Sequence, residues 1–193
     1  MSDYTRKFVA ATVQAEPVWL DLNGSVDKII ALCEEAAAEG AAIIAFPETW
    51  IPGYPWWIWL DSVAWQSQFV VRYAQNSLQV DSPEFEKISG TARRLGLAIV
   101  LGYSERVGGS LYMGQALIGS DGEVLKTRRK LKPTHVERSV FGEGDGSDIA
   151  VVDSEFGRLG ALCCAEHNQP QNKYPKFGQQ EQQPVAAGAS FSV

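Results

Sequence analysis

Two apolar runs of strand length, separated by a helical segment, constrain the fold of this chain most. Residues 7–14, "KFVAATVQ", form a continuous apolar run, as expected for a strand buried on both faces. Residues 23–40 repeat apolar side chains at helical spacing, where Ser25 can cap the start and Gly40 can end the helix. Residues 41–46, "AAIIAF", read as a second buried strand. This order predicts a parallel pair of strands with a crossover helix.

The rest of the chain extends this pattern into a layered α/β protein. Residues 57–77 are predicted to be helical, and a further helix is predicted to open at Ser82 and Pro83, the preferred capping and first-turn positions. Five further segments read as strands: 97–103, 111–119, 123–131, 148–153 and 158–164. No internal repeat or linker divides the sequence, so we expect residues 1–193 to form a single domain.

Composition excludes several classes of function. Apolar residues make up 45% of the chain and the formal net charge is −6, which indicates a globular protein without general attraction to nucleic acid or anionic membranes. No segment has the length of a membrane span, and the first residues lack the apolar region of a signal peptide. The cysteines are Cys33, Cys163 and Cys164, an odd count that favours a reducing cytoplasm over a disulfide framework. Two histidines and no Cys-x-x-Cys pair leave little from which to build a zinc site.

Cys164 stands where a strand gives way to a segment that can open a helix. Helix N–H groups at such an elbow favour the thiolate over the thiol, so Cys164 is a candidate nucleophile. The alternative is a small buried apolar residue, the usual fate of a free cysteine. For Cys163, whose side chain is expected to point to the opposite face of the strand, that alternative is much stronger.

Two charged residues are further candidates. Glu48 follows the second buried strand directly, where α/β sheets place their sites, although a lone glutamate can equally be a capping or surface carboxylate. Most of the basic residues in 126–132 are expected on a solvated face, but Lys130, nearest the strand end, could turn inward. The glycine-rich residues 141–148 follow no clear strand and open no helix, so they read as a turn rather than a phosphate loop.

Three blocks occur in a specific order: "FPETWIPGYP", "RKLKPTHVERxVFGEGDGSD" and "CCxEHxQP". With them the chain, from about residue 7 to its end, resembles the nitrilases of the carbon–nitrogen hydrolase superfamily. The resemblance implies a four-layer α-β-β-α sandwich that needs no metal or cofactor. It places the catalytic glutamate on Glu48, the lysine on Lys130, the nucleophile on Cys164 and a second glutamate on Glu137. It also implies a homo-oligomer, a dimer or a larger spiral assembly.

The implied reaction converts a nitrile to a carboxylic acid and ammonia through a thioimidate and a thioester on cysteine. An aromatic wall would remove water from Glu48 and raise its pKa, which makes it a better base near neutral pH. The residues expected to contact substrate are Trp50, Tyr54, Trp56, Trp57, Ala165 and His167. We expect an aryl or arylalkyl nitrile as substrate, because aromatic side chains offer it a face.

The resemblance is incomplete after Cys164. Ala165 stands where nitrilases usually have tryptophan, and Pro175 lies inside the predicted helix that follows, which should weaken it. The chain stops short of a complete nitrilase, so the second sheet is expected to be incomplete and the chain alone to be poorly soluble and poorly active. Two alternatives remain: an amidase or carbamoyl hydrolase with the same three residues, or an inactive binding or assembly protein with this fold.

Overall fold

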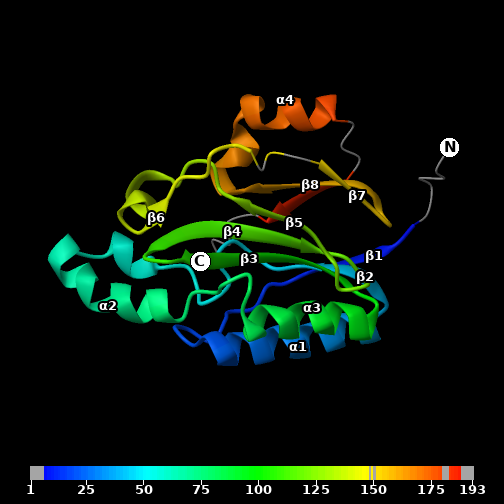
Figure 1. The fold of residues 1–193 in the computed structure, drawn as a ribbon, viewed down its shortest axis with the longest axis horizontal. Coiled ribbons are helices and arrows are strands. Elements are labelled where there is room, and N and C mark those ends of the chain that lie inside the picture. The colour runs from blue at the N-terminus through cyan, green and yellow to red at the C-terminus, as the bar shows by residue number, and fades with distance from the viewer. Residues whose placement is uncertain (1–6, 148, 150, 180–182, 188–193) are drawn as a thin grey trace.

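The computed structural model describes residues 7–147, 149, 151–179 and 183–187 as four layers (Figure 1). Helices α1 (Leu22–Ala38) and α3 (Pro83–Leu95) cover one face of a first sheet, and a second, smaller sheet lies against the opposite face. Helix α4 (Pro170–Gly178) lies on the far side of the second sheet. The predicted α-β-β-α sandwich is confirmed.

The first sheet has the strand order β1-β2-β3-β4-β5, with β6 paired to β4. Its strands are β1 (Val9–Thr12), β2 (Ala41–Ala45), β3 (Ala98–Val107), β4 (Ser110–Ile118), β5 (Val124–Arg129) and β6 (Phe141–Gly142). Strands β1, β2 and β3 are parallel, and β3, β4 and β5 are antiparallel. The predicted parallel pair around α1 is therefore confirmed.

The second sheet has the order β7-β8-β9 in the described part of the chain. Strands β7 (Val151–Ser154) and β8 (Gly157–Cys163) are antiparallel, and β9 (Gln183–Ala187) is parallel to β8. Of the strand predicted over 148–153, residues 151–153 lie in β7, whereas residues 148 and 150 lie outside the described residues. Residues 188–193 also lie outside them.

Local signals explain the helix ends. Ser82 accepts a hydrogen bond from Phe85 N (3.3 Å) and Pro83 opens α3, as predicted. The predicted cap of α1 is wrong, because Asp21 accepts from Gly24 N (2.9 Å) and starts the helix earlier. Ser25 is instead buried inside the helix, where its hydroxyl donates to the carbonyl oxygen of Val18 (2.9 Å). Asp21 lies four residues before Ser25 and caps backbone donors about one turn earlier, so the helix already includes Ser25.

The remaining helical segments lie beside the sandwich or at its loops. Helix α2 (Val63–Gln75) begins at the capping residue Ser62 and follows the short 3-10 helix η1 (Trp56–Trp59). Two more 3-10 helices are η2 (His135–Ser139) and η3 (Cys164–Asn168). Helix α4 runs through Pro175, so the predicted weakening does not break it. Within the described ranges, no helix combines the length and apolar character needed to cross a bilayer.

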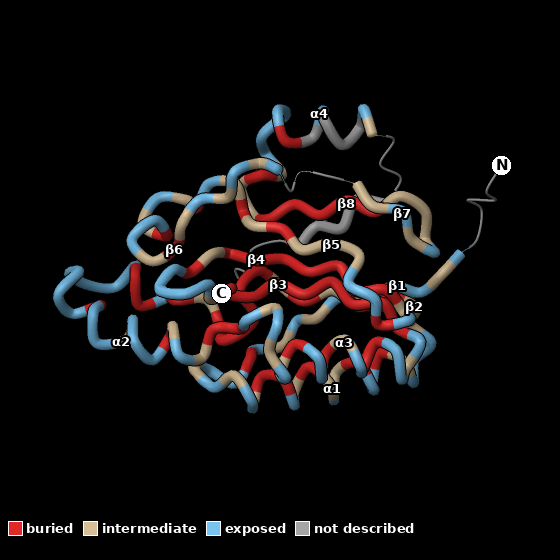
Figure 2. The backbone as a smooth tube through the Cα atoms, in the orientation of Figure 1, coloured by how far each residue is buried: buried red, intermediate tan, exposed pale blue. Residues whose placement is uncertain are grey.

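The main core lies between the first sheet and helices α1 and α3. Ile29, Ile44, Ile88 and Ile99 are each at most 2% exposed and belong to one apolar cluster. Figure 2 shows buried backbone along β3 and β4 and on the sheet-facing sides of both helices. The prediction that β1 is buried on both faces is wrong, since Val9 is 55% exposed. Strand β1 lies at the edge of the sheet and, among the described strands, pairs with β2 alone.

Candidate active site

Glu48 follows β2 and lies between the two sheets, 4% exposed. The neighbouring strand β3 passes directly beneath it, and Trp50 N donates to the carbonyl oxygen of Gly102 (2.9 Å). A Cβ atom on Gly102 would lie 2.0 Å from Pro47 O and 2.9 Å from the Glu48 Cα. Only glycine at position 102 therefore allows the Glu48 segment to lie this close to the sheet.

Lys130 follows β5 directly and turns inward, as its position at the strand end allowed. The side chain is buried, and Nζ donates to Oε1 of Glu48 and to Oε2 of Glu137, both at 2.8 Å. Gly144 N donates to the carbonyl oxygen of Lys130 (3.0 Å). A Cβ atom on Gly144 would meet that same oxygen at 3.0 Å, so glycine is needed in this turn.

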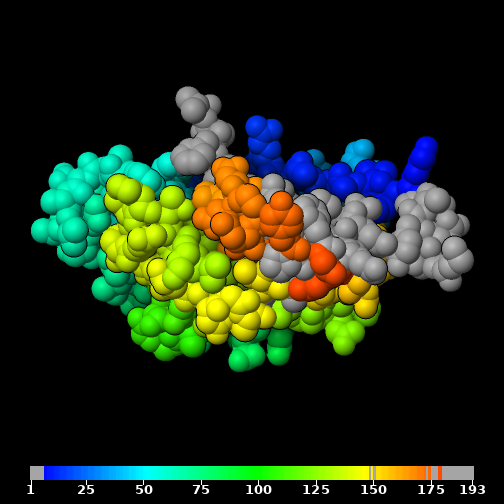
Figure 3. Space-filling model, turned by 90° about the horizontal axis from the view of Figure 1, so that it is seen from above, coloured from blue at the N-terminus to red at the C-terminus, as the bar shows by residue number. Residues whose placement is uncertain are grey.

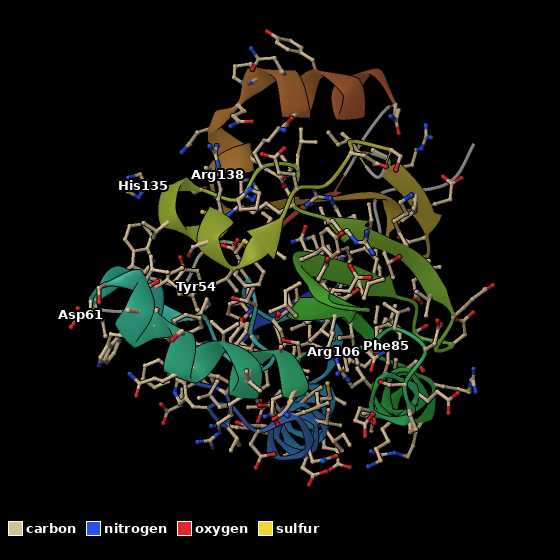
Figure 4. All side chains as sticks on the ribbon, turned by 60° about the vertical axis from the view of Figure 1, so that its left-hand side comes forward. Tyr54, Asp61, Phe85, Arg106, His135 and Arg138 are labelled. Atoms are coloured by element: carbon tan, nitrogen blue, oxygen red, sulfur yellow. The ribbon has the colours of Figure 1, made fainter. Side chains whose placement is uncertain are left out.

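Glu137 lies in η2, and its carboxylate is held by several donors. Tyr54 donates its hydroxyl to Oε1 (2.8 Å), whereas Oε2 accepts from Thr134 N (2.6 Å) as well as from Lys130. Trp59 Nε1 donates to the Tyr54 hydroxyl (3.0 Å), and its ring stacks on His135 at 5.8 Å between centroids. Figure 4 shows Tyr54 and His135 on the same side of the molecule. Glu137 thus connects the aromatic loop to Lys130.

The two adjacent cysteines stand at the end of β8, and their placement corrects one expectation. Cys163 is 1% exposed, and its Sγ donates to Oε1 of Glu48 (3.0 Å). The prediction that Cys163 points away from the site is wrong, because the face of β8 that carries it is the one turned toward the first sheet. Cys164 is half-buried and has a φ of +51°, so it leaves the strand and no longer follows its alternation.

Burial sets the protonation of the site. It raises the pKa of Glu48, although Lys130 and the Cys163 thiol act in the opposite direction. The pKa of Cys164 is also raised, by burial and then by the Glu48 charge; Lys130 and the N–H of Ala165 offset this in part. The N–H of Ala165 thus acts in the direction expected of the elbow, but burial and the Glu48 charge outweigh it. A thiol in this environment needs a base to become a nucleophile.

Glu48 offers an oxygen for that role. Its Oε1 is occupied by Lys130 and Cys163, while Oε2 is buried and has no hydrogen-bond partner among the described residues. Burial lowers the pKa of Lys130, but the Glu48 and Glu137 carboxylates outweigh burial and leave its pKa raised, so the ammonium stays charged. The site thus combines the buried Glu48 carboxylate, which has one oxygen without a hydrogen-bond partner among the described residues, with the Lys130 ammonium and the Cys164 thiol.

Backbone strain concentrates at these segments. The structure describes four non-glycine residues with positive φ, and three of them are Thr49, His135 and Cys164. Thr49 follows Glu48, and His135 lies two residues before Glu137. Such conformations persist where the surrounding structure fixes them, and they cluster at functional sites.

The residues predicted to contact substrate lie in three places: apolar clusters, the aromatic loop and η3. Trp50 is 3% exposed in the main core, with its indole N–H donated to the carbonyl oxygen of Ala15 (2.8 Å), and Trp57 packs on Phe69 beside α2. Tyr54 and Trp56 pack together at 4.8 Å, and Tyr54 reaches Glu137. Ala165 and His167 are half-buried in η3, next to Cys164.

Several residues that position the site were not singled out from the sequence. A glycine inside the apolar run 97–103 is the signal that could have identified Gly102, since glycine within a strand often marks a close backbone approach. Glu166 stands in the block "CCxEHxQP", which assigns it no role, and Arg128, its partner in a buried ion pair at 2.7 Å, carries no comparable local signal. No group of three or more His, Cys, Asp or Glu side chains suited to a metal ion occurs among the residues that the structure describes.

Comparison with known proteins identifies the class to which this fold and site belong. The family model for carbon-nitrogen hydrolases matches residues 9–186. Among solved structures, an amidase from Nesterenkonia sp. superposes with a TM-score of 0.70 at 21% identity, covering 94% of this chain and 64% of that one. A carbon-nitrogen hydrolase from Helicobacter pylori G27 gives a TM-score of 0.71 at 14% identity, covering 95% and 61%. The chain belongs to the carbon–nitrogen hydrolase family, in its nitrilase branch.

Three curated relatives carry the name nitrilase and place the chain in this branch. A nitrilase from Pseudomonas syringae pv. syringae is 58% identical over 183 residues, covering 95% of this chain and 54% of that protein. An arylacetone-specific nitrilase from Alcaligenes faecalis is 54% identical, with 98% and 53% covered. An aliphatic nitrilase from Rhodococcus rhodochrous is 52% identical, with 100% and 53% covered. The chain spans about half the length of these relatives.

Proposed function

We propose that this protein hydrolyses a nitrile to the carboxylic acid and ammonia, with Cys164 as nucleophile and Glu48 as general base. Similarity to curated nitrilases supports the reaction. The observation that carries the assignment is the buried Glu48 carboxylate, whose Oε2 has no partner among the described residues while Lys130 fixes Oε1. A base held at one oxygen and open at the other is suited to repeated proton transfer.

The reaction begins when Glu48 Oε2 takes the thiol proton of Cys164 as Sγ bonds to the nitrile carbon. The electron pair released from the carbon–nitrogen triple bond moves to nitrogen, which takes the thiol proton back from Glu48 to give a thioimidate. Glu48 then takes a proton from water as its oxygen bonds to the carbon, and returns a proton to nitrogen as ammonia leaves, which gives a thioester. A second water displaces Sγ, releases the acid and restores the thiol.

Lys130 and Glu137 serve this chemistry by charge and position. The Lys130 ammonium stabilises negative charge that develops on the former nitrile nitrogen and on the tetrahedral carbon's substituents, because it is fixed before the reaction starts. Glu137 accepts a second hydrogen bond from the same ammonium, at 2.8 Å from Nζ. Glu137 also has the position to orient the attacking water.

The choice between the adjacent cysteines rests on access. Cys163 is 1% exposed and engaged with Glu48, whereas Cys164 is half-buried and stands beyond the strand end, where a substrate can reach it. Cys164→Ala should abolish ammonia release from a nitrile, and Cys163→Ala should leave most of it. Mass spectrometry after limited alkylation should locate the modification on Cys164. Equal losses in both variants, or preferential modification of Cys163, would contradict the assignment.

The aromatic loop supports a preference for aryl or arylaliphatic nitriles. Tyr54 and Trp56 pack together beside Glu137, with Trp56 38% exposed and able to offer a ring face. The relatives include both an arylacetone-specific and an aliphatic nitrilase, so the comparison does not decide the substrate. A specificity profile should favour phenylacetonitrile over propionitrile; the reverse order would contradict this preference. Parallel assays on each nitrile and its amide test the amidase alternative.

We further propose that copies of the chain assemble through the surface of η1 and α2. Four side chains there are strongly exposed for apolar residues: Trp59 (47%), Leu60 (70%), Val63 (73%) and Val71 (64%). In Figure 1, α2 extends away from the sandwich. Exposed apolar patches of this kind mark association surfaces. Val63→Lys combined with Val71→Lys should shift the gel-filtration position toward smaller species, and an unchanged position would exclude this surface.

A further inference from the structure

A buried polar network connects the two sheets beside the candidate site. It consists of Gln115 on β4, Arg128 on β5 and Glu166 on η3, which are 0%, 4% and 2% exposed. Arg128 Nη1 donates to Gln115 Oε1 (2.6 Å), and Arg128 Nη2 donates to Glu166 Oε1 (2.7 Å). Gln115 Nε2 in turn donates to the carbonyl oxygen of Leu162, near the end of β8 (3.1 Å).

The Glu166 carboxylate also accepts from two backbone N–H groups, one just beyond the end of β5 and one on the last residue of β8. Oε1 accepts from Leu131 N and Oε2 from Cys163 N, both at 2.8 Å. Leu131 directly follows Lys130, and Cys163 directly precedes Cys164. One carboxylate therefore binds the backbone next to Lys130 and the backbone next to Cys164, the two residues proposed to act on the substrate.

The network keeps its charge although it is buried. Burial opposes ionisation of Glu166, but the Arg128 guanidinium and the two backbone donors outweigh it and lower the pKa of the carboxyl. A buried ion pair contributes little net stability compared with apolar side chains of similar size. Its distinctive property is direction, since each hydrogen bond fixes a distance and an angle.

We propose that Glu166 is a positioning residue that sets the distance between the Lys130 ammonium and the Cys164 thiol, with Arg128 and Gln115 holding its carboxylate. This inference rests on the proposed function, in which Lys130 and Cys164 act on the same carbon. A displacement of about 1 Å between reacting groups can cost about 10²-fold in rate. Figure 3 shows helix α4, in orange, beside the yellow-green segment that contains η2 and β6.

The test compares Glu166→Gln with a matched control. Glutamine keeps the shape, but its NH₂ group faces a donor, so at least one of the three hydrogen bonds is lost. We expect kcat for a nitrile to fall by about 10²-fold with KM changed less than threefold. Glu34→Gln removes the same charge from an exposed ion pair with Arg94, also at 2.7 Å, and should leave both constants unchanged. A kcat for Glu166→Gln within threefold of the parent would overturn the proposal.

A double variant separates positioning from stability. Arg128→Met combined with Glu166→Gln removes both buried charges, so the melting temperature should recover relative to Glu166→Gln alone. A positioning role requires that kcat stays low in the double variant, because Leu131 N and Cys163 N still lack their shared carboxylate. Recovery of kcat together with the melting temperature would show a merely structural role and overturn the proposal.

A third readout does not depend on turnover. The rate at which iodoacetamide alkylates Cys164 should fall at least tenfold in Glu166→Gln and stay unchanged in Glu34→Gln, even if the parent chain releases no ammonia. Absence of ammonia release from the parent chain would count against the proposed function but not against the positioning role of Glu166. Should Glu166→Gln fail to fold, Gln115→Met, which loosens Arg128 without removing a charge, should lower the alkylation rate severalfold. An unchanged rate there would overturn the proposal.

Discussion

The two sheets contribute to the site by different means. The first sheet carries Glu48 and Lys130, and helices α1 and α3 back it with a core of fully buried aliphatic side chains. The second sheet carries Cys164, and beside the site it is joined to the first by polar contacts: Cys163 with Glu48, and Glu166 with Arg128. Apolar contacts between the sheets, such as those of Leu159 with its cluster, complete the interface.

Apolar packing therefore fixes the strands that lead to the base Glu48 and the cation Lys130, whereas hydrogen bonds orient the nucleophile Cys164. Apolar packing is non-directional and tolerates small changes of shape, whereas hydrogen bonds to a buried carboxylate weaken steeply with misalignment. The core behind the first sheet therefore holds the strands that lead to Glu48 and Lys130. The position of Cys164 relative to them depends on a few directed contacts. Changes at Glu48, Lys130 and Gly102 on the first sheet, and at Cys163 on the second, test this division.

The largest effect is expected from the charged pair itself. Glu48→Gln keeps the shape but removes the proton acceptor, so kcat should fall by at least about 10²-fold. Lys130→Met should be comparably damaging, because the carboxylates of Glu48 and Glu137 would then face each other without the cation. Steady-state ammonia release measures both. Lys132→Met, at a side chain that is 52% exposed, is the matched control and should leave kcat unchanged. Near-normal turnover in either site variant would show that these roles are misassigned.

An intermediate effect is expected from Gly102→Ala on β3. The new Cβ atom would lie 2.0 Å from Pro47 O, so the Glu48 segment must move away from the sheet. We expect a loss of about ten- to a hundredfold in kcat/KM, because the base is displaced by a fraction of an ångström or more.

The matched control for this change lies on α3. Gly90 is exposed there, and a Cβ atom at that position meets nothing within 4 Å. Gly90→Ala should leave activity intact and stabilise the chain by up to about 1 kcal/mol. Equal activity of the two alanine variants would mean that the close approach beneath Glu48 has no functional role.

The smallest effect concerns pH. Burial raises the pKa of Glu48, and a base works only when deprotonated, so kcat/KM should fall as pH drops through that raised pKa. The Cys163 thiol donates to the charged form of the carboxylate and lowers its pKa. Cys163→Ala should therefore move the acidic limb of the profile to higher pH, by less than about one unit. A shift to lower pH would contradict the hydrogen bond between Cys163 and Glu48.

Local sequence signals predicted the first sheet well. The strand–helix–strand unit, the Ser82–Pro83 start of α3 and the inward turn of Lys130 follow from periodicity, capping chemistry and position. The exposure of β1 and the Asp21 cap were missed, because both depend on competition between neighbours rather than on one residue. The resemblance to nitrilases supplied the four-layer fold and the candidate residues together.

The contacts between the sheets could not be derived in the same way. Whether Cys163 meets Glu48 depends on which face of β8 is turned to the first sheet, and alternation within one strand does not determine that. The pairing of Arg128 with Glu166 joins residues 38 positions apart across two sheets. Long-range polar contacts of this kind have no period or spacing in the sequence.

The left-handed backbone at Thr49 and His135 has a consequence for engineering heat resistance. Each such residue costs about 1–3 kcal/mol, and glycine would remove most of that cost while adding a smaller entropy to the unfolded chain. A library screened only for survival at high temperature should therefore accumulate glycine at these two positions. The same library screened for turnover should reject it, because a freer backbone beside Glu48 and Glu137 no longer fixes their direction. Thermostable variants of this chain should thus be sought on α2 and the other outer helices rather than in the loops that carry the carboxylates.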